Sequence, residues 1–283
     1  LNAGLRRHFF WIWIFCNTMN QIYLHALIAW RLGLRSHAMY ALFVLGASLM
    51  GIAYLAGAFS LRQPMVVAMD MGFSGLRILG LLLVLFWMQE AFAKDIDRRT
   101  ITFALAYPAP RSSYVIGRFL GVMGLVVLAV VLWGGLLFLM GQYADWGYAQ
   151  SSKNYLNLGF LLVLCGAAID LFVIGAFFVF VTSLAETSVL PFLAGFGFAL
   201  GARSLGGMLD YLSLSPLVDR EMKAALLPAL EKLRWLLPDL SRLDWRQITL
   251  YDQWPATGDM LQGICVAIGY AFIMLGGAVL SYH

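Results

Sequence analysis

The sequence predicts an all-α, polytopic membrane protein with six transmembrane helices. Of its 283 residues, 61% are hydrophobic and only 12% are charged, whereas soluble domains are about half apolar and about a quarter charged. Apolar runs of about 20 residues, the length that crosses a bilayer as a helix, recur along the chain. Membrane β-barrels alternate apolar and polar residues instead. We therefore expect one membrane domain over 38–283, preceded by an N-terminal segment over 1–37.

The N-terminal segment begins with an apolar run over 8–16 that is too short to cross a bilayer as a helix. Arg6 and Arg7 precede it, as in a signal peptide, but no small-residue cleavage site follows. The preferred explanation is an overlong gene start, with Met19 as the natural initiator. The alternative is an interfacial helix anchored by Trp11 and Trp13.

Residues 20–35 have apolar side chains toward one side of a helix and polar side chains on the other. This pattern indicates an amphipathic helix lying in the membrane interface. The alternative is the frayed start of the first span.

The six predicted spans are 38–59, 71–92, 114–140, 155–184, 189–209 and 260–280. The connection between spans two and three is rich in basic residues, and basic connections stay in the cytoplasm. Both termini are then cytoplasmic, and the long loop over 210–259 is external. The basic residues of this loop oppose that placement, but loops of this length can be translocated. An amphipathic helix over 222–237 is expected on the outer membrane surface or over the pathway.

Residues 94–118, between spans two and three, form the longest polar interruption in the first two thirds of the chain. A short charged stretch and an apolar strip come first. The chain then breaks at Pro108 and Pro110, and Ser112 or Ser113 is placed as the N-cap of a new helix. The pattern predicts a rigid elbow at the membrane surface.

The elbow resembles the signature of type-2 ABC exporter permeases, the membrane subunits of ATP-driven export systems. The matching positions are Asp95, Asp97, Thr100, Leu105, Pro108, Arg111, Tyr114, Gly117 and Arg118. One position departs, because Arg99 stands where the family usually has glycine before the threonine. A second, weaker match over 237–242 resembles the multicopper-enzyme-maturation branch of that family.

The resemblance implies a bacterial permease of the inner (cytoplasmic) membrane that works by alternating access. Its partners would be a separate ATPase subunit, which binds ATP and Mg²⁺, and a second permease copy, either identical or a close paralogue. It also implies a set of ATPase-coupling residues: Asp97, Arg98, Arg99, Thr100, Phe103, Pro108, Arg111 and Tyr114.

The chain itself has no P-loop of the form G-x-x-x-x-G-K-[ST]. We therefore expect no bound cofactor and no enzymatic activity on this subunit. Three cysteines without C-x-x-C spacing and four scattered histidines indicate no metal site. The net charge of +4 is explained by orientation in the membrane rather than by nucleic acid.

Asp170 lies deep in the fourth predicted span, and Arg203 lies in the fifth. Charges within a membrane are costly and often functional, so both residues are candidates for the substrate pathway. The alternative is a structural Asp170 bound to a neighbouring helix, through Arg203 or a serine. Asp70 and Arg77 are assigned to the outer interface.

Two other functions are weighed. A membrane enzyme acting on lipid would need clustered His, Asp or Ser-Lys groups at one membrane face, and the sequence has none. An ion- or proton-coupled secondary transporter would use Asp170, but it would also need inverted repeats and several buried charges. The sequence leaves the substrate open.

Overall fold

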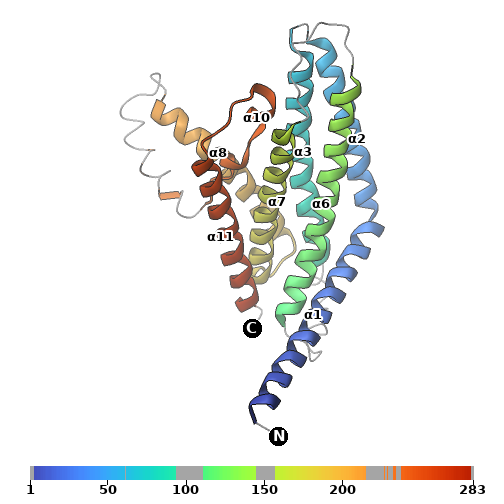
Figure 1. The fold of residues 1–283 in the computed structure, drawn as a ribbon, viewed down its shortest axis with the longest axis vertical. Coiled ribbons are helices and arrows are strands. Elements are labelled where there is room, and N and C mark those ends of the chain that lie inside the picture. Colours follow the sequence, from blue (N-terminus) through green and yellow to red (C-terminus); the bar gives the residue numbers. More distant parts are fainter. Residues whose placement is uncertain are drawn as a thin grey trace.

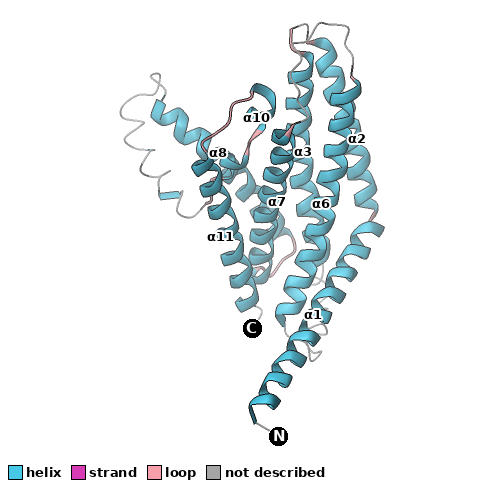
Figure 2. Cartoon of the chain, in the orientation of Figure 1, coloured by secondary structure: helices cyan, strands magenta, loops and turns pink. Residues whose placement is uncertain are grey.

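The computed structural model describes residues 3–60, 62–93, 111–144, 157–214 and 237–281, together with 226, 228, 232 and 233. Every regular element in these ranges is a helix (Figure 2). Six helices are long and apolar enough to cross a membrane. They are α2 (His37–Phe59), α3 (Pro64–Met88), α6 (Arg111–Tyr143), α7 (Leu158–Leu184), α8 (Val189–Leu214) and α11 (Thr257–Ser281). The predicted all-α fold with six membrane-spanning helices is confirmed.

The helix ends follow local chemistry. α3 starts at Pro64, ahead of the expected start at 71, because proline suits the first helical turn, where its missing N–H costs nothing. After Met88 the helix continues as a short π-helix, η1 (Gln89–Ala93), which leads into the elbow. α6 begins at Arg111, within the elbow, so Ser112 and Ser113 lie inside the helix and the expected N-cap at either serine is wrong.

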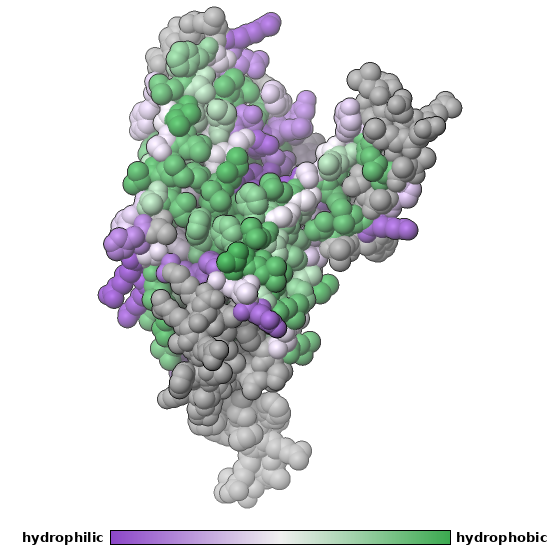
Figure 3. All heavy atoms as spheres, turned by 180° about the vertical axis from the view of Figure 1, so that it is seen from behind, coloured by the Kyte–Doolittle hydropathy of each residue, from purple (hydrophilic) through white to green (hydrophobic). Residues whose placement is uncertain are grey.

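Four of the other five spans, α3, α6, α8 and α11, pack against α7, and α2 packs against α3 and α6. In Figure 1, α2, α3 and α6 stand side by side, and α8 and α11 lie on the other side of α7. Large aromatic side chains fill the interior, among them Phe73, Phe119, Trp133 and Phe178, each almost fully buried. Hydrophobic residues also cover a broad band of the described surface (Figure 3), as expected for helices that face lipid.

The N-terminal segment forms one helix, α1 (Ala3–Arg35), which packs along α6. Three glycines of α6 make this close approach possible. A Cβ at Gly121 would collide with the backbone carbonyl of Ala26, and Cβ atoms at Gly117 and Gly124 would lie 2.7 Å from His25 and Trp30. Small residues at this spacing allow two membrane helices to approach closely.

The interfacial placement of α1 stays a prediction. The side chains before Met19, including Trp11 and Trp13, lie outside the described part, and so do the elbow residues 94–110. The predicted amphipathic helix over 222–237 also lies largely outside it.

The second half of the 210–259 loop packs onto the bundle. It contains a 3₁₀ turn, η2 (Leu240–Leu243), and a short helix, α10 (Arg246–Tyr251). Its apolar side chains Leu240, Leu243, Trp245, Ile248 and Leu250 are buried. We call residues 239–251 the strap.

Replacing Gly121 by alanine tests the α1–α6 contact. The new Cβ would force α1 away from α6, and overpacking of this kind costs about 1–3 kcal/mol. We expect a lower midpoint of thermal unfolding in detergent. Gly135→Ala is the matched control on the same helix, because nothing lies within 4 Å of a Cβ there. Equal midpoints for the two variants would contradict this packing.

Candidate functional site

Asp170 lies near the middle of α7 and is fully buried, with 0% of its side chain exposed. Its Oδ2 accepts hydrogen bonds from Arg203 of α8, from Nη2 at 2.6 Å and from Nε at 3.0 Å. Nη2 of Arg77, from α3, lies 3.4 Å from the same oxygen. Two guanidinium groups from two different helices therefore compensate this buried carboxylate, as a charge removed from water requires.

The network continues from Arg77 to the strap. Nη1 of Arg77 lies 2.5 Å from Oδ2 of Asp244. Arg246 also binds Asp244, through Nε at 2.8 Å and Nη2 at 2.7 Å. Its Nη1 reaches back to α3, to Asp70 at 3.0 Å and to Ser74 Oγ at 2.6 Å. Charges of opposite sign thus alternate from the middle of α7 to the start of α3.

The network joins four parts of the chain: α3, α7, α8 and the strap. It contains the arginines Arg77, Arg203 and Arg246 and the aspartates Asp70, Asp170 and Asp244, so its formal charge is balanced. The backbone takes part as well, because Arg77 Nη2 lies 3.5 Å from the carbonyl of Leu240. We call these six side chains the charge network.

At the strap end of the network, Asp244 and Arg246 shift each other's pKa. Burial alone would raise the pKa of Asp244, but the hydrogen bond from Arg246 and the charges of Arg77 and Arg246 lower it below its ordinary value. Burial alone would lower the pKa of Arg246, but Asp244 and, to a smaller extent, Asp70 raise it. A carboxylate with a lowered pKa stabilises the fold above its ordinary pKa, and this contribution is lost only as the pH falls through the lowered value. Asp244 is therefore ionised at neutral pH, as its ion pairs require.

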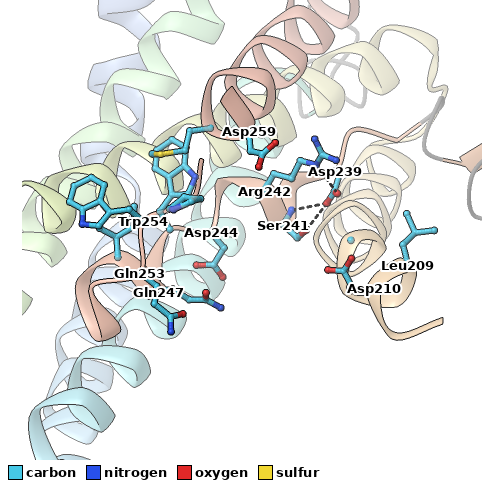
Figure 4. Close-up of a pocket in the computed structure, with 15 residues that line it drawn as sticks. Leu209, Asp210, Asp239, Ser241, Arg242, Asp244, Gln247, Gln253, Trp254 and Asp259 are labelled. Carbon is cyan, nitrogen blue, oxygen red and sulfur yellow. Dashed lines mark hydrogen bonds and ion pairs between the residues drawn. The ribbon is translucent and has the colours of Figure 1, made fainter. Parts of the chain in front are cut away.

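A cavity of about 620 Å³ is walled in part by the strap (Figure 4). Its walls come from the end of α8, the strap, residues 253–255 and the start of α11. Four aspartates line it, Asp210, Asp239, Asp244 and Asp259, together with Arg242. Asp239 lies 3.4 Å from Arg242 and also accepts hydrogen bonds from Ser241. The cavity is thus polar, and Asp244 belongs both to its wall and to the charge network.

The two ends of the elbow are tied together at the far end of α3. Arg118 of α6 donates a hydrogen bond to the carbonyl of Ala91 in η1. The same guanidinium lies 4.6 Å from the ring centroid of Tyr114, and the ring of Phe92 meets Tyr114 edge-on. Ser36, between α1 and α2, donates a hydrogen bond to Glu90 of η1. We call this arrangement the elbow base.

Of the residues expected to couple to an ATPase, Tyr114 is buried in the elbow base and Arg111 is the first residue of α6. The other six lie outside the described residues: Asp97, Arg98, Arg99, Thr100, Phe103 and Pro108. The two residues expected in the pathway, Asp170 and Arg203, lie together as an ion pair.

Sequence reasoning missed the roles of Asp70 and Arg77, which it assigned to the outer interface. Their spacing carried a signal: Asp70, Ser74 and Arg77 lie four and then three residues apart, and therefore on one face of a helix. No comparable pattern connects Asp244 or Arg246 to α3.

The comparison with protein families decides the assignment. The family model described as ABC-2 family transporter protein matches residues 30–208. The chain belongs to the ABC-2 transporter family. This ABC-2 match extends from α1 through most of α8 and includes the elbow, Arg77, Asp170 and Arg203. No curated protein matches the chain.

Proteins of the ABC-2 family are membrane components of ABC transporters and are not themselves the catalytic subunits. The described residues contain no group of three or more His, Cys, Asp or Glu that could hold a metal ion. The strap, with Asp244 and Arg246, lies beyond the region that the ABC-2 model matches.

Removing the charge of Asp170 tests the network. Asp170→Asn leaves Arg77 and Arg203 facing a neutral amide, and breaking a buried pair costs about 3–5 kcal/mol. We expect a clearly lower midpoint of thermal unfolding. Asp210→Asn, at an exposed aspartate of α8 with no ion pair among the described residues, should change little. An Asp170 variant as stable as the parent would show that the network contributes nothing to the fold.

Proposed function

We propose that this ABC-2 protein is the permease subunit of an ATP-driven exporter and that a separate ATPase subunit docks on the elbow over 94–118. The observation that carries the proposal is the elbow base. The elbow joins α3 to α6, and the contacts of Arg118 with Ala91 and Tyr114 hold its two ends together. Force applied to the elbow therefore moves both helices.

The elbow base also reaches α1 and α2. α1 packs along α6 through the glycines of α6, and Ser36 links the junction between α1 and α2 to Glu90. The ring of His25, on α1, meets Tyr114 edge-on with centroids 5.7 Å apart. Burial and, next, Arg118 lower the pKa of His25, so its imidazole is neutral at pH 7 and adds no charge beside Arg118. A displaced elbow would carry these helices with it.

ATP and Mg²⁺ are proposed to bind to the partner, because the chain lacks the P-loop that would hold the phosphates. The permease converts the partner's closure into a tilt of α3 and α6, and substrate then moves by alternating access. In this scheme the elbow and both termini lie in the cytoplasm, and a second permease copy completes the transporter in a bacterial inner membrane. The excess of basic residues in the elbow supports this orientation.

A proton-coupled secondary transporter is the second candidate, because Asp170 is a buried carboxylate. A proton carrier must bind and release its proton as it crosses between two environments. Asp170 instead lies between the guanidinium groups of Arg77 and Arg203. These ion pairs favour a structural role for Asp170 over a role in the transport pathway. They therefore also favour the ATP-driven mechanism over proton coupling.

Co-purification with the ATPase encoded nearest to the permease tests the proposed function. Arg111→Glu reverses a charge at the end of the elbow, and Phe103→Asp places a charge in its apolar strip. We expect both changes to abolish ATPase binding while the permease stays folded in the membrane. Arg62→Glu reverses an exposed arginine in the connection between α2 and α3, and should leave binding intact.

Two results would contradict the docking of an ATPase on the elbow: no ATPase bound to the unaltered permease, or full binding by both elbow variants. Loss of binding by Arg62→Glu as well would show that charge anywhere on the protein matters, rather than the elbow.

A further inference from the structure

The strap lies against two helices, α7 and α8, at positions where glycine makes room for it. A Cβ at Gly166 of α7 would lie 2.5 Å from the carbonyl of Leu243, and one at Gly159 would lie 2.8 Å from Ile248. A Cβ at Gly206 of α8 would collide with Ser241. The strap is thus closely seated on the bundle, yet it is joined to α11 by residues 252–256, which are all exposed.

Two kinds of contact hold the strap. Its apolar side chains are buried, whereas its ion pairs to α3 lie nearer the surface. Asp70 is 52% exposed and Arg246 is 28% exposed, in contrast to 0% for Asp170. Exposed ion pairs exchange with water at little cost, and fully buried pairs do not. The strap end of the network is therefore the end that can open.

Arg77 stands between the two ends. Its Nη2 faces Asp170 inside the bundle, and its Nη1 faces Asp244 on the strap. If the strap leaves, Arg77 loses Asp244 but keeps Asp170, so neither charge is left unpaired in the interior. The cavity of about 620 Å³ that the strap helps to line provides space beside the strap into which it can move.

From these observations we infer that the strap is a gate over Asp170 and Arg203, latched shut by the ion pairs of Asp244 and Arg246 with α3. The inference rests on the proposed function, because the force that opens the gate is the nucleotide-driven movement of α3. α3 carries Asp70, Ser74 and Arg77 toward one end and leads into the elbow through η1 at the other. A tilt of α3 would move these three side chains away from their partners on the strap.

The latch is tested first in the isolated permease, by hydrogen–deuterium exchange. Asp244→Asn removes the charge that Arg77 and Arg246 share. We expect the amides of 246–251 to exchange at least tenfold faster, while those of α7 stay as slow as in the parent. Asp210→Asn, which lines the same cavity but has no ion pair among the described residues, should leave 246–251 unchanged.

Two results of this exchange experiment would overturn the inference: unchanged exchange of the strap in Asp244→Asn, or an equal increase in α7. The second result would show that the strap is an inseparable part of the bundle.

The opening is tested in the complex with the ATPase. Spin labels are placed at Gln247→Cys on the strap and Met71→Cys on α3, both exposed positions, in a background without the three native cysteines. We expect the distance between labels to shift when ATP is bound and hydrolysis is blocked. A pair at Ile78→Cys and Leu132→Cys, on α3 and α6, should keep its distance because these helices move together.

The two proposals fail in different ways. Without an ATPase that binds, the proposed function fails, and the exchange experiment still decides whether the latch exists. If the ATPase binds but the distance between Gln247 and Met71 is the same in every nucleotide state, the gate is overturned and the permease assignment stands.

Discussion

The structure depends on the burial of one carboxylate. Asp170 lies in the middle of the central helix, where it is fully removed from water. Such a charge is tolerated only with partners, and the partners are supplied by Arg203 from α8 and Arg77 from α3. Arg77 also pairs with Asp244, which ties the strap to the bundle. The relative positions of three helices and the strap thus follow from compensating one buried charge.

α3 connects the two functional regions. Toward its start it contributes Asp70, Ser74 and Arg77 to the charge network, and after its end η1 belongs to the elbow base. It is also the most buried of the six candidate spans, because 67% of an apolar stretch of 18 residues in it lies inside the protein. A buried rod with an elbow at one end and ion pairs at the other is suited to transmit movement along the bundle.

The fold could be predicted from composition because six apolar runs leave few alternatives in a bilayer. The pairing of Asp170 with Arg203 could be anticipated, since each needs an opposite charge within the membrane. The strap could not, because its elements span only four and six residues, too few for a helical period to be recognised. Glycine by itself is no guide to helix packing, because Gly197 of α8 has nothing within 4 Å of a Cβ. The glycines that matter for helix packing include Gly117 and Gly121 of α6, and only the contact with α1 distinguishes them.

The central claim is that the ATPase moves the elbow and that α3 transmits this movement to the charge network. An electron cryo-microscopy structure of the permease with its ATPase, in nucleotide-free and ATP-bound states, tests it most directly. The account predicts that the ATPase contacts residues 94–110 and that the contact between Arg118 and Ala91 persists in both states. It also predicts that the ion pair between Arg77 and Asp244 is broken in one of them. An ATPase bound at the opposite end of the bundle, or an elbow without contacts to it, would contradict the account.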